Sequence, residues 1–295
     1  MTLPTLTALL TGIVDYAGLF PPSAHGMDAA VAEYARERCG PDAWMLGRFV
    51  LPVARLEEFT TSAAGLLQPA ASDPWRLSAL PGADLAADIE RIADFNARRL
   101  GAIVDTVEFR ATTVAEIEGA LPRIPPSLTP YVELPAANDP AELVQALARA
   151  GARAKLRTGG VTADAFPGAT QVARFIAACT RAGVPFKATA GLHHPLRGSY
   201  RLTYEPGSAQ GEMFGFLNVF LAAAFARAGA SGAELEAILQ ERSPEAFRFD
   251  ARGVAWRHLI VPRQELEAVR ARVAMAFGSC SFREPVDDLR SMGLL

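Results

Sequence analysis

The chain has 295 residues, of which half are hydrophobic and 21% are charged, so a sizeable core is expected and a disordered protein is excluded. The formal net charge of −3 gives no electrostatic reason to expect a nucleic acid or an anionic membrane as a partner. Three cysteines without paired spacing argue against a disulfide framework or a zinc cluster. The first residues lack the basic region of a signal peptide, and the longest apolar run, residues 213–226, is too short to span a bilayer. These features predict a soluble, cytoplasmic protein.

Short apolar runs alternate with Ala-rich amphipathic segments along most of the chain. Each apolar run ends near a Pro or Gly turn, and the segment after it has apolar residues at helical spacing. The first five pairs of strand and helix are expected at 13–17 with 27–38, 48–51 with 55–67, 76–80 with 85–100, 103–109 with 114–121, and 131–134 with 139–150. Such alternation predicts a parallel sheet with helices outside it.

Residues 154–198 form the clearest strand–helix–strand unit. AKLRTGG opens the unit at 154–160, a one-sided helix is expected at 169–182, and PFKATAGLHHPLRG closes it at 185–198. Lysines inside such apolar strands are unusual, because an unpaired buried ammonium group is costly. This stretch is therefore the strongest site signal in the sequence.

The rest of the chain supplies a barrel closure and one insertion. A long apolar helix is expected at 213–227, and its Phe-rich part leaves self-association into a homo-oligomer open. The eighth strand is placed at 273–278, before a last helix at 285–292, although residues 265–276 also have the spacing of one continuous helix. Alternation at 247–258 predicts an antiparallel hairpin within an inserted subdomain at about 231–262. The sequence thus predicts one α/β domain over residues 1–295, a (β/α)8 TIM-type barrel with a small helix and β-hairpin insertion.

Charged side chains lie at the carboxyl ends of the expected strands, where barrels of this type carry their sites. Those positions are Asp15, Glu108 with Arg110, Glu133, Lys155 with Arg157, and Lys187 with His193 and His194 just beyond it. In the fourth to seventh strands two carboxylates face four cations, which we expect to converge on one cavity. The surplus predicts a carboxylate or phosphate on the substrate, whereas a self-satisfied network of ion pairs is the alternative.

The two lysines of this set are placed on neighbouring strands, which lie about 4.8 Å apart. Repulsion between the two ammonium groups, with Arg157 on the same face as Lys155, favours the neutral amine of Lys155. A neutral amine can attack a carbonyl carbon and form a Schiff base. Lys155 is therefore the candidate nucleophile, and Glu133 or Glu108 would move the protons.

The two lysine motifs, KLRTGG and FKATAGL, resemble the sixth and seventh strands of the deoxyribose-phosphate aldolase family. That resemblance implies a class I aldolase with a TIM-barrel fold, in which Lys155 forms the imine and Lys187 tunes it. It also makes Glu108 the nearest counterpart of the family's aspartate on the fourth strand. Two departures are visible: Arg157 replaces a small hydroxyl residue, and LHHP replaces a plainer turn after the seventh strand.

The segment GSCSF at 278–282 resembles the family's closing GASS segment, which implies phosphate binding by backbone N–H groups at Gly278 and Ser279. Four further segments, LFPPS, GLHHPLRG, FGFLNVF and FGSCSFREPVDDL, resemble a bacterial protein family, but that similarity implies no activity. The pair Gly159 and Gly160 could also cradle a phosphate. Cys280 lies near an expected helix start, but no base stands beside it in sequence, so a nucleophilic role is not favoured.

These observations favour a lyase of the aldolase type that acts on a small anionic carbonyl compound through a lysine Schiff base and needs no cofactor. A divalent-metal-dependent lyase or isomerase is the second hypothesis, with Glu108, Glu133, Asp15 and His193 or His194 as ligands. A non-catalytic barrel that binds a metabolite is the third. Neither a nucleic acid nor a membrane is expected as a partner.

Overall fold

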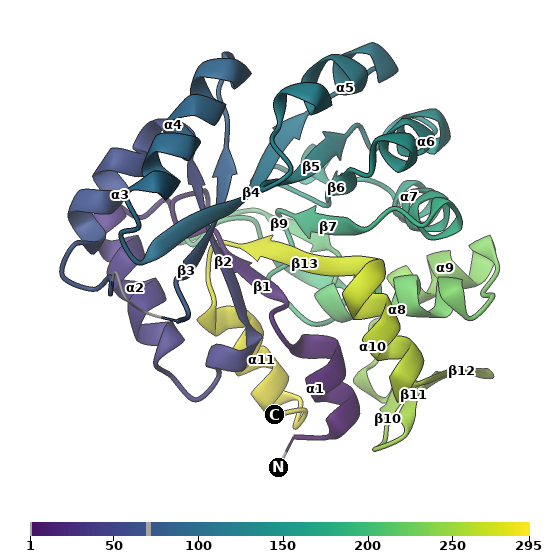
Figure 1. The fold of residues 1–295 in the computed structure, drawn as a ribbon. Helices are drawn as coiled ribbons and strands as arrows, with labels where there is room; N and C mark the ends of the chain where they lie inside the picture. Colours follow the sequence, from purple (N-terminus) through teal and green to yellow (C-terminus); the bar gives the residue numbers. More distant parts are fainter. Residues whose placement is uncertain (1, 69–71) are drawn as a thin grey trace.

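Eight parallel strands close into a barrel in the computed structural model, which describes residues 2–68 and 72–295. Around the barrel the strands follow the order β1-β13-β7-β6-β5-β4-β3-β2, with helices outside them (Figure 1). The barrel strands are β1 (Val14–Tyr16), β2 (Leu46–Pro52), β3 (Trp75–Leu80), β4 (Ala102–Arg110), β5 (Thr129–Leu134), β6 (Arg153–Arg157), β7 (Phe186–Thr189) and β13 (Ala274–Ser279). The predicted α/β fold of TIM type is confirmed.

The helices follow the predicted apolar periodicity. In α7, the four apolar residues at three/four spacing are buried, and Gly183 ends the helix in the left-handed conformation with φ 66°. The helices are α1 (Pro4–Leu10), α2 (Met27–Arg38), α3 (Leu56–Ala63), α4 (Leu85–Ala97), α5 (Val114–Ala120), α6 (Ala141–Ala150), α7 (Ala169–Ala182), α8 (Phe216–Arg227), α9 (Gly232–Leu239), α10 (Arg263–Arg272) and α11 (Arg283–Ser291). Helix α1 was not predicted.

The eighth strand, β13, closes the barrel by pairing with β1 on one side and β7 on the other. The guanidinium of Arg270 in α10 donates to the carbonyl oxygens of Leu9 and Thr11 at 2.7 and 2.9 Å, and to those of Ala274 and Met275. These bonds fix the end of α10 to the start of β13. Helix α10 therefore ends before residue 274, although apolar residues continue at helical spacing to residue 276.

Two small antiparallel sheets interrupt the alternation. The predicted hairpin is confirmed as β10 (Phe247–Phe249) and β11 (Gly253–Trp256), and β12 (Leu259–Pro262) adds a third strand. This sheet lies beside α10, outside the barrel (Figure 1). The second sheet, β8 (Gly198–Arg201) with β9 (Gln210–Met213), was not predicted. Since β9 takes residues up to 213, α8 begins at Phe216 rather than at 213.

Helix α8 is buried on nearly all sides, so the Phe-rich stretch 214–225 belongs to the core of the single chain. Asn218, which is fully buried in α8, accepts a hydrogen bond from the Arg197 backbone N–H at 2.9 Å. Its amide donates to the carbonyl oxygens of Ile238 and Glu241 at 2.7 and 2.8 Å. One side chain thus joins the loop after β7, α8 and the end of α9. Across the described ranges, no helix combines the length and apolarity needed to cross a membrane.

We expect Asn218→Ala to lower the free energy of unfolding by about 3 kcal/mol, because three backbone groups lose their partner in a buried place. Urea unfolding followed by circular dichroism measures the change. The exposed Gln240→Ala, whose side chain makes one local bond in α9, is the control and should shift the curve little. Equal midpoints for the two variants would contradict this account of Asn218.

Candidate active site

Lys155 on β6 and Lys187 on β7 are direct partners in the barrel register. Their residues are only 5% and 1% exposed, so both amines lie inside the barrel. Among the 29 basic residues Lys and Arg, these two are the only lysines in the sequence. Two primary amines have therefore been placed side by side at the same level of the barrel, in a chain that uses arginine everywhere else.

Three carboxylates neutralise the two lysines. Lys155 Nζ lies 2.9 Å from Glu108 Oε2 and 3.1 Å from Glu133 Oε2. Lys187 Nζ lies 2.5 Å from both Asp15 Oδ2 and Glu108 Oε1. Glu108 therefore bridges the two ammonium groups. The hydroxyl of Ser78 also donates to Glu108, whereas Arg157 Nε contacts Glu133 at 3.3 Å.

This arrangement sets the charge of the buried groups. Burial alone would raise the pKa of Glu108, but Lys155 and Lys187 together hold it far below its usual range. Burial would lower the pKa of Lys187, but Asp15 and Glu108 outweigh burial and raise that pKa. The pKa of Glu133 is likewise lowered by Lys155 and Arg157 against the effect of burial.

Repulsion between the two ammonium groups, which was expected to favour the neutral amine of Lys155, is countered by the carboxylate that the two lysines share. Glu108 reaches across from β4 and lies between the two amines, so each faces a carboxylate before it faces the other amine. Lys187 is instead a firmly held ammonium. The sequence showed that both lysines face inward, but it did not show that one glutamate bridges them.

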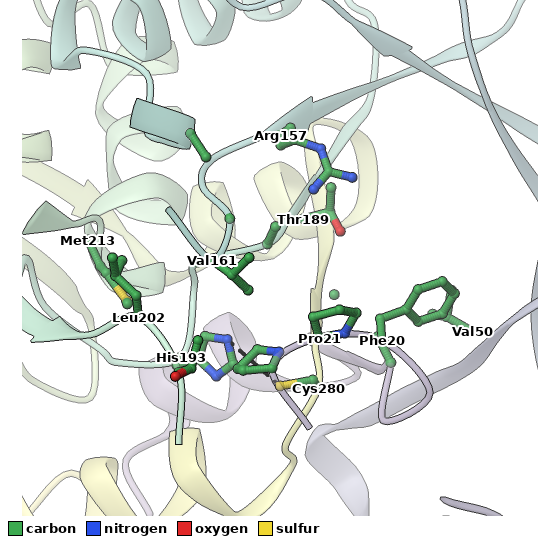
Figure 2. Close-up of a pocket in the computed structure, with 18 of the residues that line it drawn as sticks. Phe20, Pro21, Val50, Arg157, Val161, Thr189, His193, Leu202, Met213 and Cys280 are labelled. Atoms are coloured by element: carbon green, nitrogen blue, oxygen red, sulfur yellow. Dashed lines mark hydrogen bonds between the residues drawn. The ribbon is translucent and has the colours of Figure 1, made fainter. Parts of the chain in front are cut away.

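A cavity of about 420 Å³ lies above this network, at the carboxyl ends of the strands. Lys155, Lys187 and Glu108 are among the residues that line it. In Figure 2, Arg157 and Thr189 lie on the opposite side from His193 and Cys280. The remaining walls are largely apolar and are labelled in the figure: Phe20, Pro21, Val50, Val161, Leu202 and Met213. Its size and mixed lining suit a small metabolite.

The other predicted residues fall into three groups. Gly160, Gly278, His193 and His194 line the cavity with the lysines and Arg157. Asp15 and Glu133 contact the lysines without lining the cavity, whereas Gly159 and Ser279 are simply not among the lining residues of the described chain. Arg110 is exposed and is not among the cavity-lining residues of the described chain, so its predicted convergence with the other cations is wrong. It is the last residue of β4, where the strand has already reached solvent.

The turn after β7 explains the glycines near the site. Ala190 and Gly191 both have left-handed backbones, with φ 63° and 70°, and the hydroxyl of Thr158 donates to the Ala190 carbonyl at 2.6 Å. A Cβ on Gly191 would come within 2.7 Å of the Phe166 ring, and a Cβ on Gly159 within 2.4 Å of the same ring. Close packing thus accounts for Gly159 and Gly191. Phosphate binding by the predicted glycines stays a prediction.

Helix α11 holds the two histidines. His193 Nδ1 lies 2.8 Å from Glu284 Oε2, and His194 Nδ1 lies 2.6 Å from Asp288 Oδ2. Glu284 and Asp288 are four residues apart and therefore lie on one face of α11. Neither carboxylate was predicted as a site residue, although the spacing of the two is visible in the sequence. Arg201 and Tyr204, from β8 and the loop after it, also line the cavity and were missed because this sheet was not predicted.

The metal hypothesis needs carboxylates and a histidine at one point. The described residues contain no group of three or more His, Cys, Asp or Glu side chains placed to hold a metal ion. Glu108, Glu133 and Asp15 face lysines, and the histidines face α11.

Comparison of the chain with models of known protein families and with curated proteins finds no match. The fold is a TIM-type barrel, but membership of the deoxyribose-phosphate aldolase family is not supported. That resemblance rests on the short motifs around Lys155, Lys187 and Gly278.

We expect Glu108→Gln to lower the free energy of unfolding by about 3 kcal/mol at pH 7, because both lysines lose a buried partner. The pKa of Glu108 is lower in the folded than in the unfolded protein, so its contribution is complete above about pH 5 and is lost as the pH falls. The difference in free energy of unfolding between the wild type and Glu108→Gln should therefore become smaller as the pH falls from 5 to 3. Urea unfolding at several pH values measures it.

The exposed Glu142→Gln at the start of α6 is the control and should leave the unfolding midpoint unchanged. A gap between wild type and Glu108→Gln that stays constant down to pH 3 would show that Glu108 is not the charged bridge.

Proposed function

We propose that this protein is an enzyme that acts on a small anionic carbonyl compound through an imine at Lys155, as a lyase of the aldolase type. The observation that carries the proposal is the exclusive use of lysine at two adjacent, buried positions below a cavity. A cation alone could be supplied by arginine, as at every other basic position of the chain. Imine formation requires a primary amine, which arginine cannot provide.

The contacts support a division of roles between the lysines. Lys187 shares two carboxylates and has a raised pKa, so it serves as a permanent cation near the reacting carbonyl. Lys155 is the nucleophile. Before it attacks, its ammonium must pass a proton to a carboxylate at hydrogen-bond distance. Glu133 is the better acceptor, because Glu108 is also held by Lys187 and Ser78.

The reaction then balances with groups of the site. The amine nitrogen of Lys155 bonds to the carbonyl carbon, and the carbonyl oxygen leaves as water after it receives protons from the amine and from Glu133. In the iminium that results, Glu133, which is again a carboxylate, takes the proton of the hydroxyl on the β-carbon. That carbon becomes a carbonyl, the electron pair of the broken carbon–carbon bond forms the double bond of an enamine, and the C=N π pair moves onto the nitrogen and neutralises its positive charge. The cation of Lys187 stabilises negative charge on the carbonyl oxygen during the addition.

Two arginines at the cavity suit an anionic group on the substrate. Arg157 is half exposed, and its one described ion-pair contact, to Glu133, uses Nε. Arg201 lines the same cavity, and within the described ranges no carboxylate lies at ion-pair distance from it. Arginine side chains bind carboxylates and phosphates through paired N–H groups. The positive surplus therefore lies at the cavity walls rather than among the lysines.

A non-catalytic metabolite-binding barrel is the second candidate. It is favoured by the ion-paired state of both lysines, since ammonium groups can bind an anion without forming a covalent bond. The two candidates differ in whether a covalent bond forms at Lys155.

Incubation with small aldehydes and 2-oxo acids, followed by sodium borohydride, should add mass to Lys155. Lys155→Arg should abolish the addition, because a guanidinium cannot form the imine, whereas the matched Lys187→Arg should retain it. Both variants keep the positive charge, and circular dichroism checks that both fold. Peptide mass spectrometry locates the label easily, since Lys187 carries the only other side-chain primary amine. No label across the panel, or an equal label in Lys155→Arg, would favour the binding barrel.

Phosphate or a 2-oxo acid at millimolar concentration should raise the melting temperature of the wild type by binding in the cavity. Arg201→Ala should weaken this binding about tenfold, which corresponds to about 1.4 kcal/mol. Arg110→Ala removes an exposed arginine outside the cavity and should leave the binding unchanged. An equal loss in both variants would mean that the anion is bound by general surface charge.

A further inference from the structure

Four polar side chains meet in the wall of the cavity, outside the lysine network. They are His193 after β7, Tyr204 before β9, Cys280 at the end of β13 and Glu284 in α11, and all four line the cavity. The sulfur of Cys280 lies 3.9 Å from His193 Nε2 and 3.7 Å from the Tyr204 hydroxyl. Figure 2 shows Cys280 and His193 on the same side of the cavity.

Glu284 orients this cluster. Its Oε2 accepts a hydrogen bond from His193 Nδ1 at 2.8 Å and another from the Tyr204 hydroxyl at 2.9 Å. Because Nδ1 is used by the glutamate, Nε2 is the ring nitrogen that faces the sulfur. Cysteine, histidine and carboxylate thus stand in the order in which a base activates a nucleophile and a third group orients the base.

The charges of the pair support this arrangement. Burial would lower the pKa of His193, but hydrogen bonds to Cys280 and Glu284 raise it to about 10. Burial would raise the pKa of the Cys280 thiol, but the contact with His193 lowers it overall. The pKa of Tyr204 is raised by burial and by Cys280 and Glu284, so its hydroxyl remains a proton donor. The contact between the two groups therefore favours the ion pair of a thiolate and an imidazolium over the neutral thiol and imidazole.

The other two cysteines of the chain have different surroundings. Cys179 is buried on the core face of α7, and burial raises its pKa. Cys39 is exposed at the end of α2. Neither lines the cavity among the described residues. They serve as a buried and an exposed reference within the same protein.

We propose that Cys280 is a second carbonyl-reactive group of the cavity, a nucleophilic thiolate that adds to an aldehyde carbon with His193 as proton donor. In this step the sulfur–carbon bond forms and the carbonyl π bond breaks. The oxygen takes the proton from His193 Nε2, which gives a neutral hemithioacetal, and the reverse step restores the ion pair. No oxidant or further reactant is needed.

The proposal rests on the proposed function only in that the cavity admits a carbonyl compound. It makes the cavity a site with an amine on its floor and a thiolate in its wall. Such a site suits a substrate with two carbonyl carbons, or two carbonyl reactants bound together. Lys155 takes no part in the sulfur adduct.

Alkylation by iodoacetamide, followed by peptide mass spectrometry, tests the thiolate. The rate at Cys280 should rise much less between pH 6 and pH 8 than the rate of a thiol of ordinary pKa in a short peptide, which should gain close to a hundredfold (~2 pH units). At pH 6 Cys280 should react before Cys39. A rate at Cys280 that rises as steeply as that of the peptide would overturn the proposal.

Two variants on the same face of α11 form a matched pair. Glu284→Gln should lower the rate at Cys280 at pH 6 about tenfold, because His193 loses the carboxylate that keeps it protonated. Asp288→Asn removes the equivalent partner of His194 and should leave that rate unchanged. Equal effects of the two substitutions would overturn the proposal, and if Glu284→Gln does not fold, His193→Gln replaces it with the same expected loss.

Propanal provides the test of carbonyl addition. It should protect Cys280 from alkylation in the wild type and equally in Lys155→Arg, because the thiol adduct does not require the lysine. Borohydride labelling is absent from the same Lys155→Arg protein if the imine proposal is correct. If propanal does not protect Cys280 while borohydride still labels Lys155 in the wild type, only the thiolate proposal is refuted. If propanal protects Cys280 but Lys155 is never labelled, only the imine proposal is refuted.

Discussion

The geometry of the site depends on one buried carboxylate, that of Glu108. It contacts both lysines and a serine hydroxyl. Its position between the two amines lowers the free-energy cost of burying them side by side. Charges then alternate across the barrel from Asp15 through Lys187, Glu108 and Lys155 to Glu133. Each lysine is held in one place because its neighbours in this row are held as well. A floor of this kind has no surplus positive charge to offer an anionic ligand.

In the proposed function, recognition of an anionic substrate falls to Arg157 at the end of β6 and to the elements added to the barrel. The β8–β9 sheet brings Arg201 and Tyr204 to the cavity, and α11 holds His193 and His194 from the other direction. The barrel supplies rigid strands that carry the buried network, while loops and the last helix supply groups that differ in charge and reactivity. This separation is common in TIM-type barrels, where changes in the loops alter the chemistry without altering the core.

The sequence predicted what depends on local periodicity and composition. Strand–helix alternation, the closing strand after α10 and the hairpin of β10 and β11 follow from apolar spacing and turn residues. The inward direction of Lys155 and Lys187 follows from strand alternation. What the sequence could not show depends on distance along the chain. Glu108 and Lys187 are 79 residues apart, and His193 and Cys280 are 87 residues apart, so no local pattern joins them.

Two failures have a more specific cause. Arg110 obeys the alternation that places Glu108 inside, but β4 ends there and the side chain reaches solvent. The β8–β9 sheet has strands of four residues with mixed composition, which is too short for a periodic signal. Prediction thus failed at the edges of the barrel, where the cavity takes its shape.

Because lysine occurs only at positions 155 and 187, digestion by a lysine-specific protease can report the opening of the barrel. A protease that cleaves only after lysine has two sites in the whole sequence, and both lie inside the closed barrel. Cleavage at either site requires the strands β6 and β7 to separate from their neighbours, so fraying of the surface helices produces no cleavage. The cleavage rate at low protease concentration therefore reports the free energy of opening the barrel at its most highly charged point.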